Sequence, residues 1–259
     1  MRAGLHRWDE RDWHKVRNTM GVTIHFKLQA PPATNGPGAR EIVRQLRQRA
    51  LRYKAAGRVD KVLPLREDAA ALRWGRTWRL VPVPGRPGSS YDMELTPLEG
   101  IVLGVGVGKD CEPLWLGLCR YPKTAWAGGD MRRTGLSGWR WEGFCKTQFA
   151  SLHGWPHFRR CHLAVLGLLE AARRLGCRVE VEDEGEYWPG RNEAALRRNV
   201  EEMNGAIAGA AGAMKDFDVA KGGTGVQSPI FAHPRFEHLE AEGAAQPHVA
   251  ALRKALAQP

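Results

Sequence analysis

The sequence predicts an α+β fold: a mixed, largely antiparallel sheet of about five to six strands with two or three helices packed on it. Two observations lead to this prediction. Short runs of β-branched and apolar residues alternate with polar ones in segments separated by Gly- and Pro-rich loops, which is typical of antiparallel strands. Longer segments instead repeat apolar residues at the spacing of an amphipathic helix.

The first predicted elements are a strand over residues 22–28, a loop over 31–38 and a helix over 42–56. The exposed face of this helix is strongly basic, and Arg44 and Arg47 are among its charges. Like charges three or four residues apart on a helix repel each other by about a few tenths of a kcal/mol per pair. We therefore expect an anionic group beside this helix.

The middle of the chain is strand-like. Runs over residues 78–83, 100–107 and 113–118 are separated by Pro-, Gly- and Ser-rich loops, and their spacing suits antiparallel neighbours. Gly104, Gly106 and Gly108 lie inside one alternating run, and no helix follows them. This placement argues against a phosphate-binding glycine loop.

The second half continues the alternation of strands and helices. In order, the pattern predicts a strand over 139–150, a helix from Pro156 to Gly176, a strand over 177–182, a turn over 183–190 and a long helix capped by Asn192. We expect this last helix to pack on the sheet.

Three regions differ in character. Residues 1–19 are polar and lack periodicity, so they are interpreted as an N-terminal extension, with Met20 as a candidate functional start. Residues 20–218 are predicted to form a single α/β domain. Residues 219–259 are interpreted as a C-terminal appendage. They begin with a Gly-rich break, residues 229–243 show no regular apolar spacing, and a short helix is predicted over 247–257.

The formal net charge is +11, and it is unevenly placed. Residues 1–60 carry 13 basic and 5 acidic residues, whereas residues 201–259 carry 5 and 7. A basic N-terminal half indicates an anionic partner, which could be the acidic surface of a protein or a nucleic acid.

Cysteine usage and hydropathy exclude several classes of protein. The five cysteines are scattered and form no C-x-x-C pair, which disfavours a secreted disulfide scaffold and a zinc ribbon and predicts a cytoplasmic location. No run of 18 apolar residues exists, so no membrane partner is predicted. A P-loop, a Rossmann turn and a Ser/His/Asp order are not found either.

Tryptophan and arginine alternate at two places, over residues 73–79 and 139–141. Such pairs can stack unpaired bases, at roughly 1–3 kcal/mol per base, or form the centre of a protein interface. The predicted binding residues are Arg44, Arg47, Arg73, Trp74, Arg76, Trp78, Trp139 and Trp141. By contrast, we expect Trp115, Trp126 and Trp155 to lie in the core.

A row of carboxylates is the best candidate for chemistry. Strand alternation places Glu180, Glu182 and Glu184 on one face, and Glu186 follows them. Three of these residues, Glu182, Glu184 and Glu186, are predicted to ligate a divalent cation such as Mg²⁺ or Mn²⁺. Lys146 and Glu184 are then the candidate catalytic residues, with Lys146 stabilising a phosphoryl oxyanion. The simpler interpretation is an exposed strand face and a salt bridge at a strand end.

A second metal hypothesis comes from His153, His157, Cys161 and His162, which are spaced as H-x3-H-x3-C-H. Zinc accepts these ligands, with Cys145 or Glu142 as a fourth. The alternative is that His162, on the apolar arc of its helix, is a hydrogen-bonded core histidine.

The segments VTIHF (22–26), CEPL (111–114), KTQFA (146–150) and DEGEYW (183–188) together resemble a family of uncharacterised bacterial α/β proteins. The resemblance covers residues 20–215 and is closest over residues 139–200. It implies a bacterial α/β domain and brings no catalytic residues with it.

Two functional hypotheses follow. The leading one is a binding or accessory protein that recognises a macromolecular partner, a protein first and a nucleic acid second, through a basic, Trp-rich surface, for example as an immunity or accessory component of a bacterial conflict system. The alternative is a metal-dependent enzyme acting on a phosphate-containing substrate or nucleic acid. The sequence leaves open whether the protein is an enzyme, which cofactor it uses and what its oligomeric state is.

Overall fold

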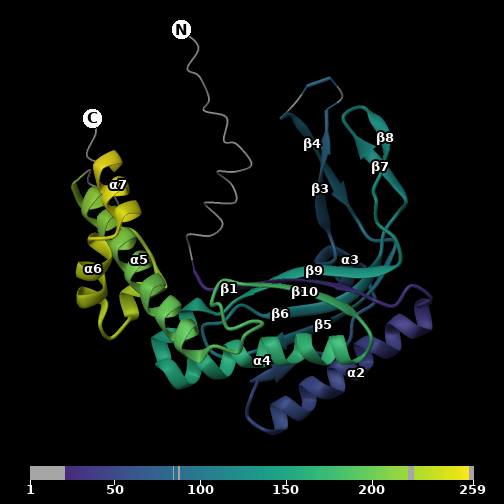
Figure 1. Ribbon diagram of the computed structural model, residues 1–259, viewed down its shortest axis with the longest axis horizontal. Helices are drawn as coiled ribbons and strands as arrows, with labels where there is room; N and C mark the ends of the chain where they lie inside the picture. Colours follow the sequence, from purple (N-terminus) through teal and green to yellow (C-terminus); the bar gives the residue numbers. More distant parts are fainter. Residues whose placement is uncertain (1–20, 84, 87, 221–224, 257–259) are drawn as a thin grey trace. The chain divides into compact units, whose positions relative to one another are not determined.

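A computed structural model describes residues 21–83, 85–86, 88–220 and 225–256. It confirms the α+β fold class (Figure 1). The chain divides into two compact units. A sheet unit consists of residues 24–145 and 159–182, and a helical unit contains the described residues of 1–23, 146–158 and 183–259. The predicted N-terminal extension lies outside the described residues, and the predicted domain boundaries remain predictions.

The main sheet has six antiparallel strands. In their order across the sheet, they are β10 (Arg178–Asp183), β1 (Thr23–Gln29), β9 (Trp139–Lys146), β6 (Leu114–Arg120), β5 (Glu99–Gly106) and β2 (Lys61–Val62). Helices α2 (Gly36–Ala55) and α4 (Trp155–Arg174) lie on one side of it (Figure 1). Alternate residues of the strands, such as Ile24, Phe26 and Leu28, are buried in the core.

Helix α2 begins earlier than its apolar pattern predicts. Asn35 is its N-cap, and the Asn35 side chain accepts a hydrogen bond from the Gly38 amide at 2.9 Å. A proline in the first turn needs no backbone donor there, so the predicted loop over 31–38 closes into the helix at Gly36. Val43, Leu46 and Ala50 form the buried stripe, as predicted.

Several short elements are missed by the sequence patterns. They are α3 (Ala69–Trp74), β4 (Ser90–Leu95) and the β7–β8 hairpin (Thr124–Ala127 and Asp130–Arg133). Each is too short to show a full period in the sequence. Strand β3 (Thr77–Pro82) corresponds to the strand predicted over residues 78–83, and β4 forms a hairpin with it. The two-residue loop of the β7–β8 hairpin consists of Gly128 and Gly129, with φ of 61° and 83°. Positive φ at both loop positions favours glycine.

Two glycines let tryptophan rings lie flat on the sheet. Gly104 is directly opposite Trp115, whose ring would be 2.7 Å from a Cβ at that position. Gly117 accommodates Trp141, whose indole N–H donates to the Trp115 carbonyl at 3.0 Å. Gly104, in the G-x-G-x-G run, therefore serves packing, in agreement with the argument against a phosphate loop.

The helical unit contains the 3₁₀ helix η1 (Gln148–His153), α5 (Glu193–Ala220), η2 (Pro229–Ala232), α6 (Phe236–Ala244) and α7 (Pro247–Leu256). Asn192 caps α5 through the Ala195 amide at 3.0 Å, as predicted. Helix α7 confirms the predicted terminal helix, whereas α6 and η2 replace the irregular segment expected over 229–243. The strand predicted over 139–150 ends at Lys146, because η1 follows it.

Within the helical unit, helix α5 packs against α6 and α7. Small residues allow this close packing, because the backbones of α5 and α6 are in contact at Gly205, Gly209 and Gly243. The packing of α5 on the sheet stays a prediction. A buried polar network joins the start of β1, η1 and α5. The Gln148 side chain accepts from the Val22 amide at 2.7 Å and donates to Asn204 at 2.5 Å. No helix in the described residues is long and apolar enough to cross a membrane.

Burial of Cys119 makes a testable contribution to stability at alkaline pH. Burial raises the pKa of this thiol to about 12. Since the folded pKa lies above the unfolded value, the stabilisation is complete below the unfolded pKa and is lost as the pH rises toward the folded pKa. We expect the free energy of unfolding to fall above about pH 9 by at most about 1.4 kcal/mol per pH unit from this group. Urea unfolding of wild type and Cys119→Ala between pH 8 and 11 measures it, and equal slopes would contradict the assignment.

Candidate binding surface

The two hairpins of the sheet unit stand next to each other (Figure 1). They contact each other at Tyr91 on β4 and Gly128 in the β7–β8 loop, where any Cβ would overlap the Tyr91 ring. The β3–β4 hairpin is also tied to the sheet, because Arg79 forms an ion pair with Glu142 on β9 at 2.5 Å. The hairpins therefore have a defined place on the sheet.

One face of the β3–β4 hairpin carries large apolar side chains that are exposed to solvent. Trp78 is 60% exposed and Leu80 is 53% exposed, whereas Met93 on the opposite face of the hairpin is buried. In the register of the hairpin, Glu94 lies opposite Trp78 and Asp92 lies opposite Leu80. The exposed face is thus apolar along β3 and acidic along β4.

The β7–β8 hairpin also exposes large apolar side chains, but the charged residue beside them is basic. Trp126 is 66% exposed and Met131, directly opposite it, is 53% exposed. Arg133, opposite Thr124, lies on the same face and is exposed. The prediction that Trp126 is a core residue is wrong. The alternation around Trp126, followed by the Gly128–Gly129 pair, was the sequence signal that could have identified this exposed hairpin position.

We call the side chains of Trp78, Leu80, Trp126 and Met131 the hairpin surface, which has two parts: Trp78 with Leu80 on β3, and Trp126 with Met131 on β7 and β8. Tyr91, which meets the β7–β8 loop, lies on the face of β4 opposite to Trp78 and Leu80, so the contact between the hairpins is not made through those two side chains. Single exposed apolar residues are common on proteins, but four large ones on two adjacent hairpins are not. Hiding such side chains from water is favourable by about 25 cal/mol per Å² of apolar area. Apolar and aromatic residues in this setting are typical of a protein interface.

The other predicted tryptophans divide into two groups. Trp74 is half exposed and stacks on Trp115, with ring centroids 4.2 Å apart and planes at 17°. This stack holds α3 against the sheet, so one face of the Trp74 ring is already occupied. Trp139 and Trp141 are buried in the core, so the prediction that they form part of a binding surface is wrong. Strand alternation directs both rings to the buried side of β9.

The predicted binding arginines make contacts within the chain. Arg44 forms an ion pair with Glu41 at 2.7 Å, and Arg76 with Glu94 at 3.3 Å. Arg47 donates to the Leu63 carbonyl at 3.2 Å. Arg73 is exposed in the last turn of α3.

The anionic group expected beside α2 is supplied by the chain itself. Hydrogen bonds from Arg44 lower the pKa of Glu41, and those from Arg40 lower the pKa of Glu67. These carboxylates relieve the repulsion along the basic helix without an external polyanion. Both pairs are exposed, so they add little to stability.

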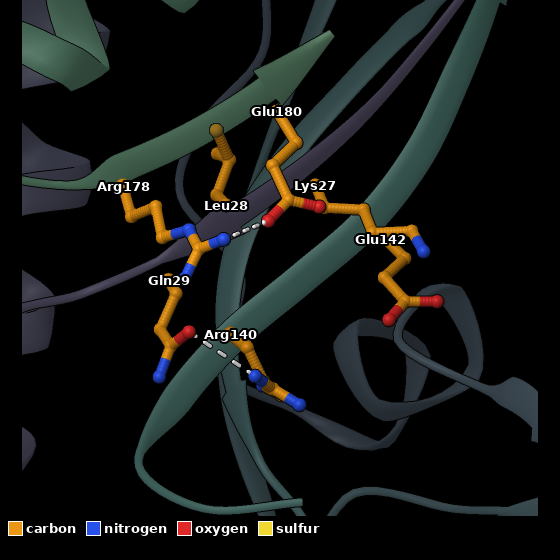
Figure 2. Close-up of a pocket in the computed structure, with 7 residues that line it drawn as sticks. All are labelled: Lys27, Leu28, Gln29, Arg140, Glu142, Arg178 and Glu180. Atoms are coloured by element: carbon orange, nitrogen blue, oxygen red, sulfur yellow. Dashed lines mark hydrogen bonds and ion pairs between the residues drawn. The ribbon is translucent and has the colours of Figure 1, made fainter. Parts of the chain in front are cut away.

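The side of the sheet away from α2 and α4 bears charges of both signs. Figure 2 shows a shallow pocket there, between strands β10, β1 and β9. Arg178 and Glu180 pair at 2.8 Å, and Arg140 donates to Gln29 at 3.2 Å (Figure 2). Lys27, Leu28 and Glu142 complete the lining. Because acids and bases alternate here, this face does not form the positive track that a nucleic acid backbone needs.

Glu184 has a structural position. Its carboxylate accepts a hydrogen bond from the Thr23 amide at 2.8 Å, and its own amide donates to the Thr23 carbonyl at 3.1 Å. Lys146, the second predicted catalytic residue, lies over the Phe149 ring with Nζ 5.5 Å from the centroid, and its side chain fills the space that a Cβ at Gly21 would occupy. Both contacts are those of a packed junction in the helical unit.

The predicted metal ligands are not gathered into a site. Glu182 and Glu186 are exposed, on the strand face and in the turn after it, while Glu184 is engaged with Thr23. Strand alternation is as predicted, since Val179 and Val181 are half-buried. Within the described ranges, no group of three His, Cys, Asp or Glu side chains is arranged to hold a metal ion.

The histidines of the predicted zinc motif have other surroundings. The His153 and His157 rings meet edge to face with centroids 5.1 Å apart. His162 is fully buried, in agreement with the alternative that it is a core histidine. Within the part of the chain that the structure describes, these residues form no metal-binding group of three either.

Comparisons with models of known families, with curated proteins and with solved structures find no match to this chain. The resemblance to a bacterial α/β family therefore remains a prediction, and the functional argument depends on the site alone.

Proposed function

We propose that this chain is a binding protein that recognises another protein through the hairpin surface. The observation that carries the proposal is the exposure of Trp78, Leu80, Trp126 and Met131, each more than half open to water on two adjacent hairpins. Side chains of this kind supply most of the free energy of protein association when they enter a pocket of a partner.

Charge favours a protein over a nucleic acid as the partner. Asp92 and Glu94 border Trp78 and Leu80, whereas Arg133 borders Trp126. A phosphate backbone would be attracted to the second hairpin and repelled by the first. A protein can present basic side chains to Asp92 and acidic ones to Arg133. We therefore propose a partner with an apolar centre and a rim of both charges.

The test uses the full chain as bait, followed by affinity measurements with the purified partner. We expect Trp78→Ser and Trp126→Ser each to raise Kd by about tenfold or more, because each removes a large apolar contact. Leu98→Ser is the matched control, since Leu98 is 55% exposed but lies outside the hairpin surface. Its affinity should not change.

Charge reversal distinguishes the two partner classes. If the partner is a protein with a basic rim, Asp92→Lys should weaken its binding. If the partner is instead a nucleic acid, the same substitution should strengthen the binding of a fluorescent single-stranded oligonucleotide. A partner insensitive to both tryptophan variants contradicts the proposal. So does an oligonucleotide that binds wild type with a steep salt dependence and binds Asp92→Lys more tightly.

A further inference from the structure

The two parts of the hairpin surface carry opposite charges beside similar apolar side chains. On the β3–β4 hairpin, Asp92 lies directly opposite Leu80. On the β7–β8 hairpin, Arg133 comes two residues after Met131 on β8, so it lies on the same face as Met131 and Trp126. Each part of the surface is therefore complementary in charge to the other part.

Asp92 and Arg133 are the charges that a partner meets on this surface. Both side chains are exposed. Within the described parts of the chain, neither of them forms an ion pair, whereas Glu94, the other acid on the β3–β4 face, is paired with Arg76 at 3.3 Å. A partner that brings the opposite charge to Asp92 or to Arg133 therefore breaks no ion pair of this chain, and the new contact orients the complex.

The β7–β8 hairpin is small, because each of its strands has four residues. Its loop contacts the Tyr91 ring and Ala127 is buried, but Trp126 and Met131 are more than half exposed. A two-stranded hairpin is only marginally stable in water unless its apolar face packs against another element. Packing of this face against a second protein surface therefore stabilises the hairpin as well as the complex.

We propose that the partner recognised by the hairpin surface is a second copy of this chain. In this dimer, the β3–β4 hairpin of each copy packs on the β7–β8 hairpin of the other, so that their exposed apolar side chains meet. Asp92 of one copy then faces Arg133 of the other. A two-fold axis forms every such contact twice, because residue i meets residue j and residue j meets residue i. The inference rests on the proposed function and names the partner that this function requires.

A second copy has the features that the partner needs. The proposed partner has an apolar centre and a rim of both charges. The hairpin surface itself has both, because Asp92 borders one pair of exposed apolar side chains and Arg133 borders the other pair. In the two-fold arrangement, each of these two residues meets the opposite charge. Closed two-fold dimers are also the commonest assemblies of soluble proteins.

The test measures self-association of the purified full chain by sedimentation velocity over a range of micromolar concentrations. We expect a monomer–dimer equilibrium that weakens with added salt, because salt screens the charge pairs at the rim. Trp78→Ser and Trp126→Ser should each raise the Kd of the dimer by about tenfold or more, since the two-fold axis removes the ring from two contacts at once. Leu98→Ser, outside the hairpin surface, should leave this Kd unchanged.

A charge exchange identifies which hairpins meet. Asp92→Lys and Arg133→Glu each bring like charges together across the interface, so each variant alone should have a dimer Kd raised by about tenfold or more. A mixture of the two variants has opposite charges at both contacts, so it should form a heterodimer with a Kd close to that of the wild type. A fluorophore on one variant identifies the heterodimer. Arg73→Glu, a charge reversal outside the hairpin surface, is the control, and it should give no more heterodimer with Asp92→Lys than the wild type does.

The outcomes separate this inference from the proposed function. The inference is overturned if the full chain stays monomeric, if association continues beyond two copies, if the tryptophan variants leave the dimer unchanged, or if mixing the two charge variants restores no affinity. Where the chain stays monomeric, a protein that it captures and that binds Trp78→Ser more weakly upholds the proposed function without the inference. A monomeric chain that captures no such protein overturns both.

Discussion

Gly243→Ala is expected to destabilise the helical unit by about 3 kcal/mol, because overpacking against backbone cannot be relieved by a side-chain rotation. A Cβ at Gly243 in α6 would overlap the carbonyl oxygen of Gly205 in α5 and approach the Gly209 amide at 3.0 Å. The two helices must move apart to accept a single methyl group. Alanine favours the helix itself by about 1 kcal/mol over glycine, which offsets only part of this cost.

Gly205→Ala is the matched control in the same pair of helices. Its Cβ would lie 3.4 Å from the Gln246 side chain and farther from other atoms, which is ordinary contact. We expect this variant to be neutral or slightly stabilised, since only the helix propensity changes. Hydrogen exchange of α6 amides reports the helical unit directly. Equal protection in the two variants would show that α5 and α6 do not pack closely at Gly243.

Asp183→Ala is expected to lower the free energy of unfolding by about 2–4 kcal/mol, since it removes hydrogen bonds from a carboxylate to three amides. Asp183 Oδ1 accepts from the Gly185 amide at 2.8 Å, and Oδ2 accepts from the Tyr187 amide at 3.0 Å and the Trp188 amide at 2.9 Å. This one side chain organises the turn after β10. Glu186, in the same turn, has a left-handed φ of 56°, a conformation that needs such support.

Two substitutions define the origin of this effect. Asp183→Asn keeps one oxygen acceptor, so we expect it to lose about half as much as Asp183→Ala. Glu182→Ala, one residue earlier on the exposed face of β10, should change the unfolding free energy by no more than about 0.5 kcal/mol. Urea unfolding followed by tryptophan fluorescence measures all three. If Glu182→Ala costs as much as Asp183→Ala, the turn is not held by Asp183.

The structural role of Asp183 also explains why the acidic segment was hard to interpret from sequence. A run of carboxylates after a strand is compatible with a cation site and with a hydrogen-bonded turn, because both use the same oxygen atoms. In the structure, Asp183 binds backbone amides and Glu184 binds the Thr23 amide. Only the distances to backbone donors separate the two interpretations.

The tryptophans show what sequence could and could not predict about the binding surface. The arginine and tryptophan pattern over residues 73–79 includes Trp78, which is exposed. The same pattern over 139–141 belongs to buried rings, and Trp126, expected in the core, is the most exposed of the hairpin residues. Burial depends on which face of a strand is covered, and a local pattern of two or three residues does not contain that information.

The sequence by itself determined the elements whose period repeats several times: the α+β class, β1, the apolar stripe of α2, the end of α4 before Gly176 and the cap of α5 at Asn192. Periodicity and capping act between near neighbours, so they are visible in one chain. Only the tertiary structure decided the short hairpins and the packing of α5 on α6. These depend on contacts between residues far apart in sequence, whose free energy exists only after the chain has folded.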